Sequence, residues 1–185
     1  HTFTLPTITG STLAVGCVEK GKLLQEEGSN HHYTAIAITS MANVIDSIEA
    51  IDACVFQQKA ITMDELIDML DHNFEGHEDK RQMLLNRAPK FGNDIEEVDR
   101  YSYWLLDMLD TEAKKYRDPM GGPYTLVVAT QAYNVELGKL VGATPDGRRR
   151  GDLLSKNMSA SIGQDRKGIT AHIKSVTKID ATGLG

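Results

Sequence analysis

The sequence is poor in the features that mark secreted, membrane-bound and nucleic-acid-binding proteins. Its two cysteines, Cys17 and Cys54, are too few for a secreted disulfide scaffold and are typical of a reducing cytoplasm. No apolar run approaches the roughly 18–20 residues that cross a bilayer, and the N-terminus carries no signal-peptide pattern. The net charge of −6 does not attract nucleic acid or an anionic membrane. We therefore expect a cytoplasmic globular protein with no nucleic-acid or membrane partner.

Motifs for metal, nucleotide and hydrolytic chemistry are also missing. The adjacent His31 and His32 would point to opposite sides of an extended segment, and His72 and His77 share no helical face. No glycine loop has the spacing that cradles phosphate, and no Ser-His-Asp pattern stands out. Three successive arginines at 148–150 could bind an anion, but in an acidic chain we interpret them as a solvated turn.

The chain has enough residues and apolar side chains for one domain of ordinary size. With 185 residues and 41% apolar composition, it could bury about 70% of its unfolded surface. Strand-forming residues favour extended chain at 1–9 and strands near 32–39 and 124–133. Helical spacing and helix signals predict the helices 10–21, 41–58, 63–74, 95–117 and 169–180. The class is mixed α/β with helix in excess.

The three central helices carry the clearest signals. Thr62 and Glu65 form a capping box, in which each side chain bonds the backbone of the other. The helix at 95–117 begins with acidic and ends with basic residues, and both groups stabilise the helix dipole. The expected buried stripes are Met41, Val44, Ile45, Ile48, Ile51 and Val55; Leu66, Ile67, Leu70 and Phe74; and Val98, Tyr101, Leu105, Met108 and Leu109.

One short stretch, GCVE at 16–19, has the composition of a radical active site. A Cys-x-Glu pair could hold a reactive sulfur beside an acid–base group, so Cys17 and Glu19 are the catalytic candidates that the sequence offers. The alternative is an ordinary helix. Two residues apart on a helix, their side chains diverge by about 200° and cannot cooperate. Cys54 lies within an apolar stripe, and we expect it in the core.

The stretch GATPDGR at 142–148 is a dense cluster of turn-forming residues. Pro145 fixes its own φ and holds Thr144 near extended geometry, while Asp146 and Gly147 suit the end of a tight turn. A plain loop turn is the simplest explanation, although so specific a run is unusual in an unconstrained loop.

The stretch from GATPDGR through KNMSASIGQDRKGITAHIKSVTKID resembles the C-terminal half of glycyl radical enzymes of the pyruvate formate-lyase type. Three further stretches resemble the same family in the same order: ANVIDSIEAIDACVFQQKAIT, LLNRAPKFGND and DPMGGPY. The resemblance covers residues 13–180. It implies a helix-rich part of a ten-stranded α/β barrel, and we expect 1–185 to be an internal part of a single such domain. The N-terminal portion and the C-terminal glycyl radical loop would lie outside this chain.

The resemblance also implies the chemistry. In this family a partner activase, with an iron–sulfur cluster and S-adenosylmethionine, generates a glycyl radical that turns an active-site cysteine into a thiyl radical. No cofactor is expected on this chain itself. Expected partners are the activase, the remainder of the polypeptide, a small-molecule substrate and a second subunit of a homodimer.

The family comparison bears on the individual residues. Many dehydratases and lyases carry a Gly-Cys-Val-Glu loop, but the residues that follow Glu19 match a later helix of the family, so we expect no radical chemistry at Cys17. Thr34 to Ser40 is less glycine-rich than the family pattern and would approach the barrel interior. The residues expected to shape the site from the barrel mouth are Thr144, Asp146, Arg148, Ser159 and Asp165.

The sequence thus predicts part of an enzyme that cleaves C–C or C–heteroatom bonds by radical chemistry, either formate acetyltransferase-like or a dehydratase or other lyase. We expect the 185 residues to be inactive alone. The alternatives are a stand-alone helical interaction or scaffold module derived from that enzyme, and an unstable gene fragment without a role.

Overall fold

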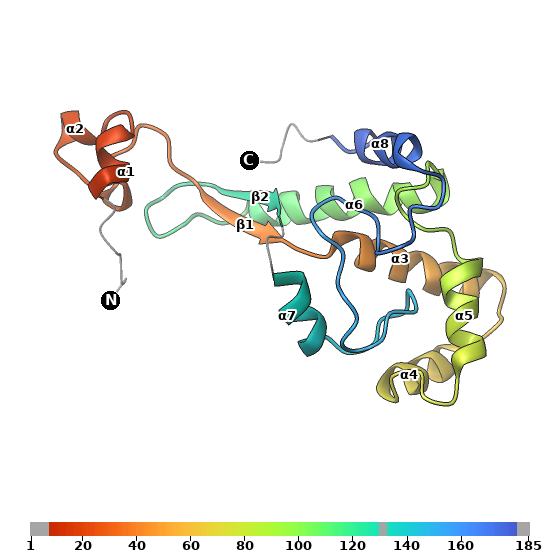
Figure 1. The fold of residues 1–185 in the computed structure, drawn as a ribbon. Helices are drawn as coiled ribbons and strands as arrows, with labels where there is room; N and C mark the ends of the chain where they lie inside the picture. The colour runs from red at the N-terminus through yellow and green to blue at the C-terminus, as the bar shows by residue number, and fades with distance from the viewer. Residues whose placement is uncertain (1–7, 130–132, 181–185) are drawn as a thin grey trace.

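The computed structural model describes residues 8–129 and 133–180, and Figure 1 shows their arrangement. Helices dominate, and within the described residues one pair of strands joins two segments that are far apart in the sequence. In order, the elements are α1 (Ile8–Leu13), α2 (Cys17–Lys20), the 3-10 helix η1 (Leu24–Glu26), β1 (Thr34–Ile38), α3 (Met41–Ile51), the π-helix η2 (Asp52–Gln57), α4 (Met63–Asp71), α5 (Glu78–Arg87), α6 (Glu96–Ala113), β2 (Tyr124–Val128), α7 (Tyr133–Leu140) and α8 (Ile169–Thr177).

β1 confirms the strand predicted near 32–39, and β2 confirms the first part of the strand predicted at 124–133. Residues 130–132 lie outside the described residues, and Tyr133 begins the helix α7 instead. β1 and β2 pair in parallel, from Thr34 opposite Tyr124 to Ile38 opposite Val128, although the paired residues are 90 positions apart in the sequence. Parallel strands are usually buried on both faces. Here the first four residues of β1 are exposed, so the described residues cover the sheet incompletely.

The long helices pack beside this sheet. α3 lies against α6 in a core cluster that contains Met41, Ile45, Val98 and Leu105. The predicted stripes are therefore confirmed in their main members. Two members are wrong: Val44 on α3 is 42% exposed and Met108 on α6 is 44% exposed, because the described residues leave both partly uncovered.

A second core cluster joins η2, α4 and α5. Its fully buried members include Cys54, Phe74 and Leu84, which confirms the core position of Cys54. The capping box of α4 is present: the amide of Glu65 donates to Thr62 Oγ1 at 3.2 Å, and the Thr62 amide donates to Glu65 Oε2 at 2.7 Å. Ile67 is 49% exposed, so its predicted burial is wrong.

Several element predictions need correction. Residues 1–7 of the predicted N-terminal strand lie outside the described residues, and Ile8 and Thr9 belong to the helix α1 instead. The predicted helix 10–21 is two short helices, because Gly16 adopts φ +99° between them. The helices α5 and α7 were not predicted. The sequence of α5 is mostly charged, and α7 begins where a run of strand formers ends.

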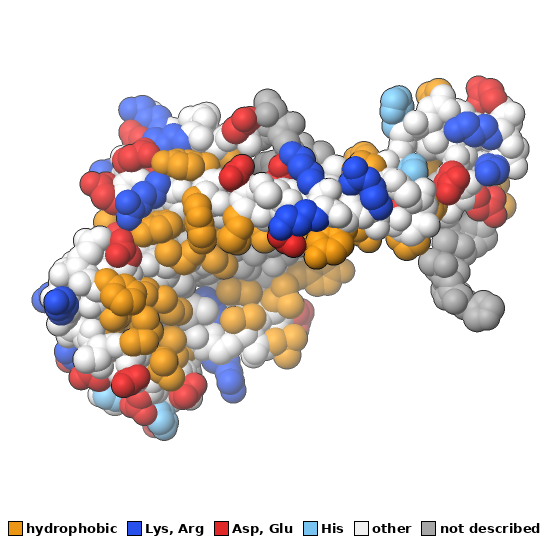
Figure 2. Space-filling model, turned by 180° about the vertical axis from the view of Figure 1, so that it is seen from behind, with side chains coloured by type: hydrophobic (Ala, Val, Ile, Leu, Met, Phe, Trp, Pro, Cys, Tyr) orange, Lys and Arg blue, Asp and Glu red, His pale blue; other side chains and the backbone are white. Residues whose placement is uncertain are grey.

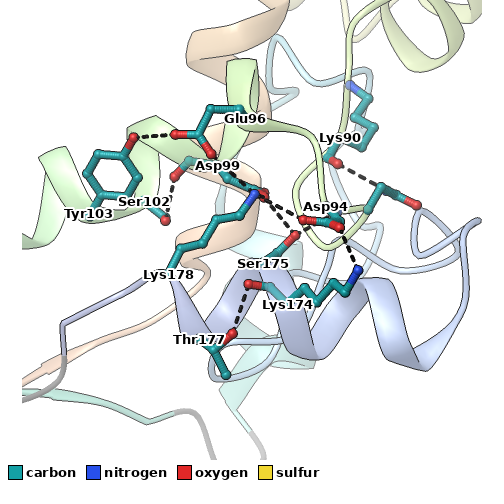
Figure 3. Close-up of polar contacts among 11 residues, drawn as sticks. Lys90, Asp94, Glu96, Asp99, Ser102, Tyr103, Lys174, Ser175, Thr177 and Lys178 are labelled. Carbon is teal, nitrogen blue, oxygen red and sulfur yellow. Dashed lines mark hydrogen bonds and ion pairs between the residues drawn. The ribbon is translucent and has the colours of Figure 1, made fainter.

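A polar clamp fastens α8 to the start of α6 (Figure 3). We use this name for Lys178 with Asp94, Glu96 and Asp99. Lys178 Nζ lies 2.7 Å from Asp99 Oδ2 and 3.2 Å from both other carboxylates. Ser175 Oγ also donates to Asp99 Oδ2 at 2.9 Å. These contacts raise the pKa of Lys178, and the hydrogen bond to Asp99 contributes most. The hydrogen bond from Lys178 in turn lowers the pKa of Asp94.

Large apolar side chains remain at the surface of the described residues. Figure 2, seen from behind, shows hydrophobic side chains interrupted by charged ones along the body of the molecule. Among the most exposed are Leu140 (78%), Phe56 (61%) and Trp104 (52%). Within the described part of the chain, no helix is both long enough and apolar enough to span a membrane.

Candidate functional site

The Cys-x-Glu pair lies on the short helix α2, as the helical alternative predicts. The Cys17 side chain is buried, 2% exposed, and its sulfur packs closely against Gly28. The exposed Glu19 turns back toward the helix start, where its Oε2 accepts a hydrogen bond of 3.1 Å from the Gly16 amide. The carboxylate thus caps its own helix instead of accompanying the thiol. That Cys17 carries out no radical chemistry stays a prediction.

The GATPDGR stretch forms the tight turn that its residues predict. The Gly147 amide donates to Thr144 O, and the Thr144 amide donates to Arg148 O, both at 2.9 Å. Asp146 Oδ1 accepts from Thr144 Oγ1 at 2.5 Å and from the Arg148 amide at 3.2 Å. Gly147 is required here, because it adopts φ +96° and a Cβ would lie 2.6 Å from Leu85.

The interpretation of the three arginines as a solvated turn is wrong for the first of them. Arg148 is only 6% exposed, whereas Arg150 is exposed. The Arg148 guanidinium donates to the carbonyls of Gly138, Val141, Gly142, Arg149 and Asp152. Three of these carbonyls lie at the C-terminal end of α7 and just after it, where a cation satisfies unpaired acceptors and opposes the helix dipole. Arg148 therefore anchors α7 to the turn.

Asp146 joins the turn to α3 through a network that we call the buried polar network: Asn43, Asp46, Lys90, Asp146 and Ser161. Asn43 Nδ2 donates to Asp146 Oδ2 at 2.7 Å, while Asn43 Oδ1 accepts from the Ser155 amide at 2.7 Å. Ser161 Oγ donates to Asp46 Oδ2 at 2.6 Å. All five residues are less than 9% exposed. Two turns of one helix thus hold three separate parts of the segment 144–161.

The charges in this network are only partly balanced. Burial raises the pKa of Asp46 from 3.8 to about 7, even though Lys90 and the hydrogen bonds from Ser161 and the Phe91 amide act in the opposite direction. Lys90 Nζ donates to the carbonyls of Leu84 and Asp146 at 3.0 and 3.2 Å. The network borders a polar cavity of about 310 Å³. The Lys90 and Arg148 side chains beside it bond to backbone carbonyls, and the carboxylates of Asp46 and Asp146 accept from hydroxyl and amide groups.

A second, apolar cavity of about 490 Å³ lies beyond the C-terminal end of β1, between α3 and α7. Its lining includes Ser40, Asn43 and Thr144, so the buried polar network meets it at Asn43. Carboxyl ends of parallel strands are where α/β folds place their ligand sites. This cavity is the strongest candidate for a functional site in the described residues.

The predicted site-shaping residues do not all reach this place. Thr144 lines the apolar cavity, while Asp146 and Arg148 line the polar one beside it. Ser159 is exposed and borders a shallow hollow beside α8. Asp165 is exposed as well. Between Ser159 and Asp165, it is Ser161 that belongs to the buried polar network.

Sequence reasoning missed Asn43, Asp46 and Lys90 as parts of the site, and it indicated Ser40 only as the last residue of the segment from Thr34. Asn43 and Asp46 stand three residues apart within the apolar pattern of α3, and such a polar pair on one buried helical face was the available signal. Lys90 and Ser40 left no comparable pattern in the sequence.

Comparison with known proteins identifies the relatives of this chain. The family model described as pyruvate formate lyase-like matches residues 1–138. Trans-4-hydroxy-L-proline dehydratase of Clostridioides difficile is 33% identical over 92% of this chain, and isethionate sulfite-lyase of Bilophila wadsworthia is 39% identical over 84%. The chain spans 22% and 18% of these two relatives.

Solved structures agree with this result. Hydroxyproline dehydratase of Clostridioides difficile, with its substrate bound, superposes with a TM-score of 0.90 at 32% identity, over 97% of this chain and 23% of its own. A glycerol dehydratase of Clostridium butyricum gives 0.87 at 38% identity, over 95% and 22%. A glycyl radical enzyme of Archaeoglobus fulgidus gives 0.89 at 32% identity, over 97% and 23%. The predicted fold class, a helix-rich part of the pyruvate formate-lyase-like α/β barrel, is confirmed, and the chain belongs to the pyruvate formate lyase-like family of glycyl radical enzymes.

Proposed function

We propose that this chain forms part of a glycyl radical enzyme that cleaves a C–O, C–S or C–C bond of a small molecule. The observation that carries the proposal is the match to dehydratase structures, with TM-scores of 0.87 and 0.90 over at least 95% of this chain. The named relatives are dehydratases and sulfite-lyases, which favours carbon–heteroatom cleavage over the formate acetyltransferase reaction.

The role of these residues in such an enzyme is to build the walls of the site. The apolar cavity lies beyond the C-terminal end of β1, and the buried polar network fixes the turn at 144–148, whose Thr144 lines the cavity. A closed apolar interior excludes water from reactive intermediates. The thiyl and glycyl radicals that start the reaction would reside on other parts of the polypeptide, because the Cys17 sulfur is buried apart from the carboxylate of Glu19, which caps its own helix.

The expected partners follow from the same proposal. A radical S-adenosylmethionine activase would install the glycyl radical, and the remainder of the polypeptide would cover the exposed β1 and the apolar surface. Within the described residues no group of three or more His, Cys, Asp or Glu side chains could hold a metal ion. The complete enzyme would act in the cytoplasm as a homodimer, and the 185 residues alone would have no activity.

The proposal is tested by activating the complete polypeptide that contains this sequence. The activase and S-adenosylmethionine are added under anaerobic conditions, and the glycyl radical is measured by electron paramagnetic resonance. Turnover is then assayed with trans-4-hydroxy-L-proline, glycerol and isethionate, with the 185-residue chain as a matched control. We expect a radical signal and product from the complete polypeptide alone. Absence of the radical in a folded, activase-treated protein would contradict the proposal.

The scaffold-module alternative draws on one observation, the exposed apolar surface that includes Phe56, Trp104 and Leu140. It predicts that the 185-residue chain is soluble and monodisperse by itself. The enzyme proposal instead predicts that the isolated chain binds a fluorescent apolar dye and associates, because its apolar faces are uncovered. Size-exclusion chromatography with dye binding separates the two.

A further inference from the structure

Ser40 occupies an unusual position at the junction of β1 and α3. It is the N-cap of α3, an eleven-residue helix, and it has φ 60° and ψ 32°, a left-handed conformation that serine rarely adopts. A serine at an N-cap normally has extended geometry and accepts a hydrogen bond from the helix. Here its side chain makes no capping hydrogen bond.

The Ser40 hydroxyl is buried and has no hydrogen-bond partner in the described part of the chain. The residue is 8% exposed, and no described residue accepts from or donates to its Oγ. The backbone around it is only partly satisfied. The amides of Asn43 and Val44 donate to Ser40 O, whereas those of Met41 and Ala42 have no acceptor among the described residues. A buried polar group without a hydrogen bond costs about 1–3 kcal/mol, so this arrangement needs a reason.

The apolar cavity supplies that reason, because Ser40 lines it. The walls are aliphatic, with Val44, Ile48 and Ile51 on α3 and Leu137 and Val141 on or beside α7. The Ser47 hydroxyl, also in the lining, already donates to Asn43 O at 2.6 Å, and that of Thr144 donates to Asp146. Ser40 therefore provides a hydroxyl that is free to bond a guest, at the positive end of a helix dipole.

We propose that this cavity binds a small aliphatic molecule through an oxyanion end, such as a carboxylate, held by the Ser40 hydroxyl and the N-terminus of α3. The inference rests on the proposed function, since it names the class of molecule that the enzyme would hold. The lining contains no Lys, Arg, Asp or Glu. An anionic end is favoured by the helix dipole, a cationic end is opposed by it, and a neutral end gains only one hydrogen bond.

The test uses the complete polypeptide and three straight-chain probes of five carbons in total, which differ in the end group: pentanoate, pentan-1-ol and pentylammonium. Ligand-observed NMR titrations give the Kd of each. We expect pentanoate to bind at least about fivefold more tightly than pentan-1-ol, and pentylammonium to bind most weakly. Ser40→Ala should weaken pentanoate binding about tenfold and pentan-1-ol binding much less.

Ser155→Ala is the matched control. The Ser155 hydroxyl is also buried and unpartnered in the described residues, but Ser155 is not in the cavity lining. This variant should leave all three affinities unchanged. Ser40→Ala should melt no lower than the wild type, since its hydroxyl bonds to no described residue, whereas a purely structural role predicts a lower Tm.

Three results would overturn the inference: equal binding of pentanoate and pentan-1-ol, equal losses in the two variants, or a structure of the complete polypeptide with the cavity filled by its own side chains. The glycyl radical signal, measured on the same samples, keeps the two proposals apart. Failure to form the radical would contradict the proposed function, whereas failure of the titrations with the radical intact would contradict only the binding site.

Discussion

The buried polar network and the polar clamp both hold a loop or helix against a long helix, yet they do so in different electrostatic environments. In the network, Asp46 is fully buried, and its pKa is raised to about 7. In the clamp, the partly exposed Asp94 faces Lys178 and Lys174, and its pKa is lowered. Burial in the network disfavours the charge on Asp46, whereas the ion pairs of the clamp favour the charges on Asp94 and Lys178.

This difference suggests two roles: the polar clamp stabilises the packing of α8, and the buried polar network fixes the positions of the residues that it joins. A partly hydrated ion pair adds modest stability and tolerates adjustment. A buried hydrogen-bond network allows little movement, because each lost partner leaves another buried polar group without a hydrogen bond. The buried polar network contributes Asn43 to the lining of the apolar cavity, whereas the polar clamp joins α8 to the start of α6 and contributes no lining residue (Figure 3). We infer that the network exists to fix the geometry of the site.

The largest expected effect comes from Asp146→Ala. The change leaves Asn43 Nδ2, Thr144 Oγ1 and the Arg148 amide without their common acceptor. We expect the free energy of local opening at residues 144–161 to fall by about 3 kcal/mol, measured by hydrogen exchange on the complete polypeptide. Turnover should fall with it.

Asp165→Ala is the control for that change, because Asp165 is an exposed aspartate on the same segment. It should change local opening by less than about 0.5 kcal/mol. Equal effects of the two variants, or unchanged folding and turnover in Asp146→Ala, would remove the positioning role of the turn.

The second prediction concerns pH. Burial raises the pKa of both Asp46 and Glu49 to about 7, so the folded state binds their protons more tightly than the unfolded chain does. This stability is complete below about pH 4 and is lost as pH rises toward 7, by at most about 1.4 kcal/mol per pH unit for each group. Thermal melts between pH 5 and 8 should therefore show a falling Tm.

Asp46→Asn should flatten part of that pH dependence, and Glu49→Gln should flatten the rest. The clamp provides the contrast: the lowered pKa of Asp94 means that its contribution is lost only as pH falls below about 4. Two results would contradict the raised pKa values of Asp46 and Glu49. One is a Tm that rises between pH 5 and 8, and the other is a pH dependence of Tm that neither variant changes.

The third and smaller effect is that of Lys178→Ala. It removes the cation of the clamp but leaves Ser175 Oγ bonded to Asp99. We expect local opening of α8 to become easier by about 1 kcal/mol, with a smaller difference from wild type at 0.5 M salt, because salt screens partly exposed charges. Lys139→Ala, which breaks an exposed pair with Glu136, should have almost no effect. A salt-independent loss in Lys178→Ala would place the clamp in the same class as the network.

The sequence predicted the regular parts of this fold because local signals agreed with the packing. The stripe on α3, the capping box at Thr62 and the acidic start of α6 each specify a helix by themselves. Prediction failed where tertiary contacts decide. Arg148 is buried because backbone carbonyls after α7 surround it, and nothing in a run of three arginines reveals that.

The candidate site was predictable only in part. Turn chemistry located the stretch 142–148, and the family resemblance indicated the segment from Thr34 to Ser40. The apolar cavity itself arises from β1, α3 and α7, which are up to about 100 residues apart in sequence, and α7 was not predicted. Likewise, Ser159 and Asp165 were expected at the barrel mouth, but both are exposed, and Ser161 between them is the buried residue of that stretch that joins the network.

The smallest expected effect also gives the most direct test of the account, which holds that radical chemistry takes place outside this chain. In the activated complete polypeptide, Cys17→Ala should keep both the glycyl radical signal and turnover near wild-type values, at a stability cost of about 1 kcal/mol for the lost buried sulfur. Retention of the glycyl radical with complete loss of turnover would identify Cys17 as the hydrogen-abstracting cysteine and contradict the account.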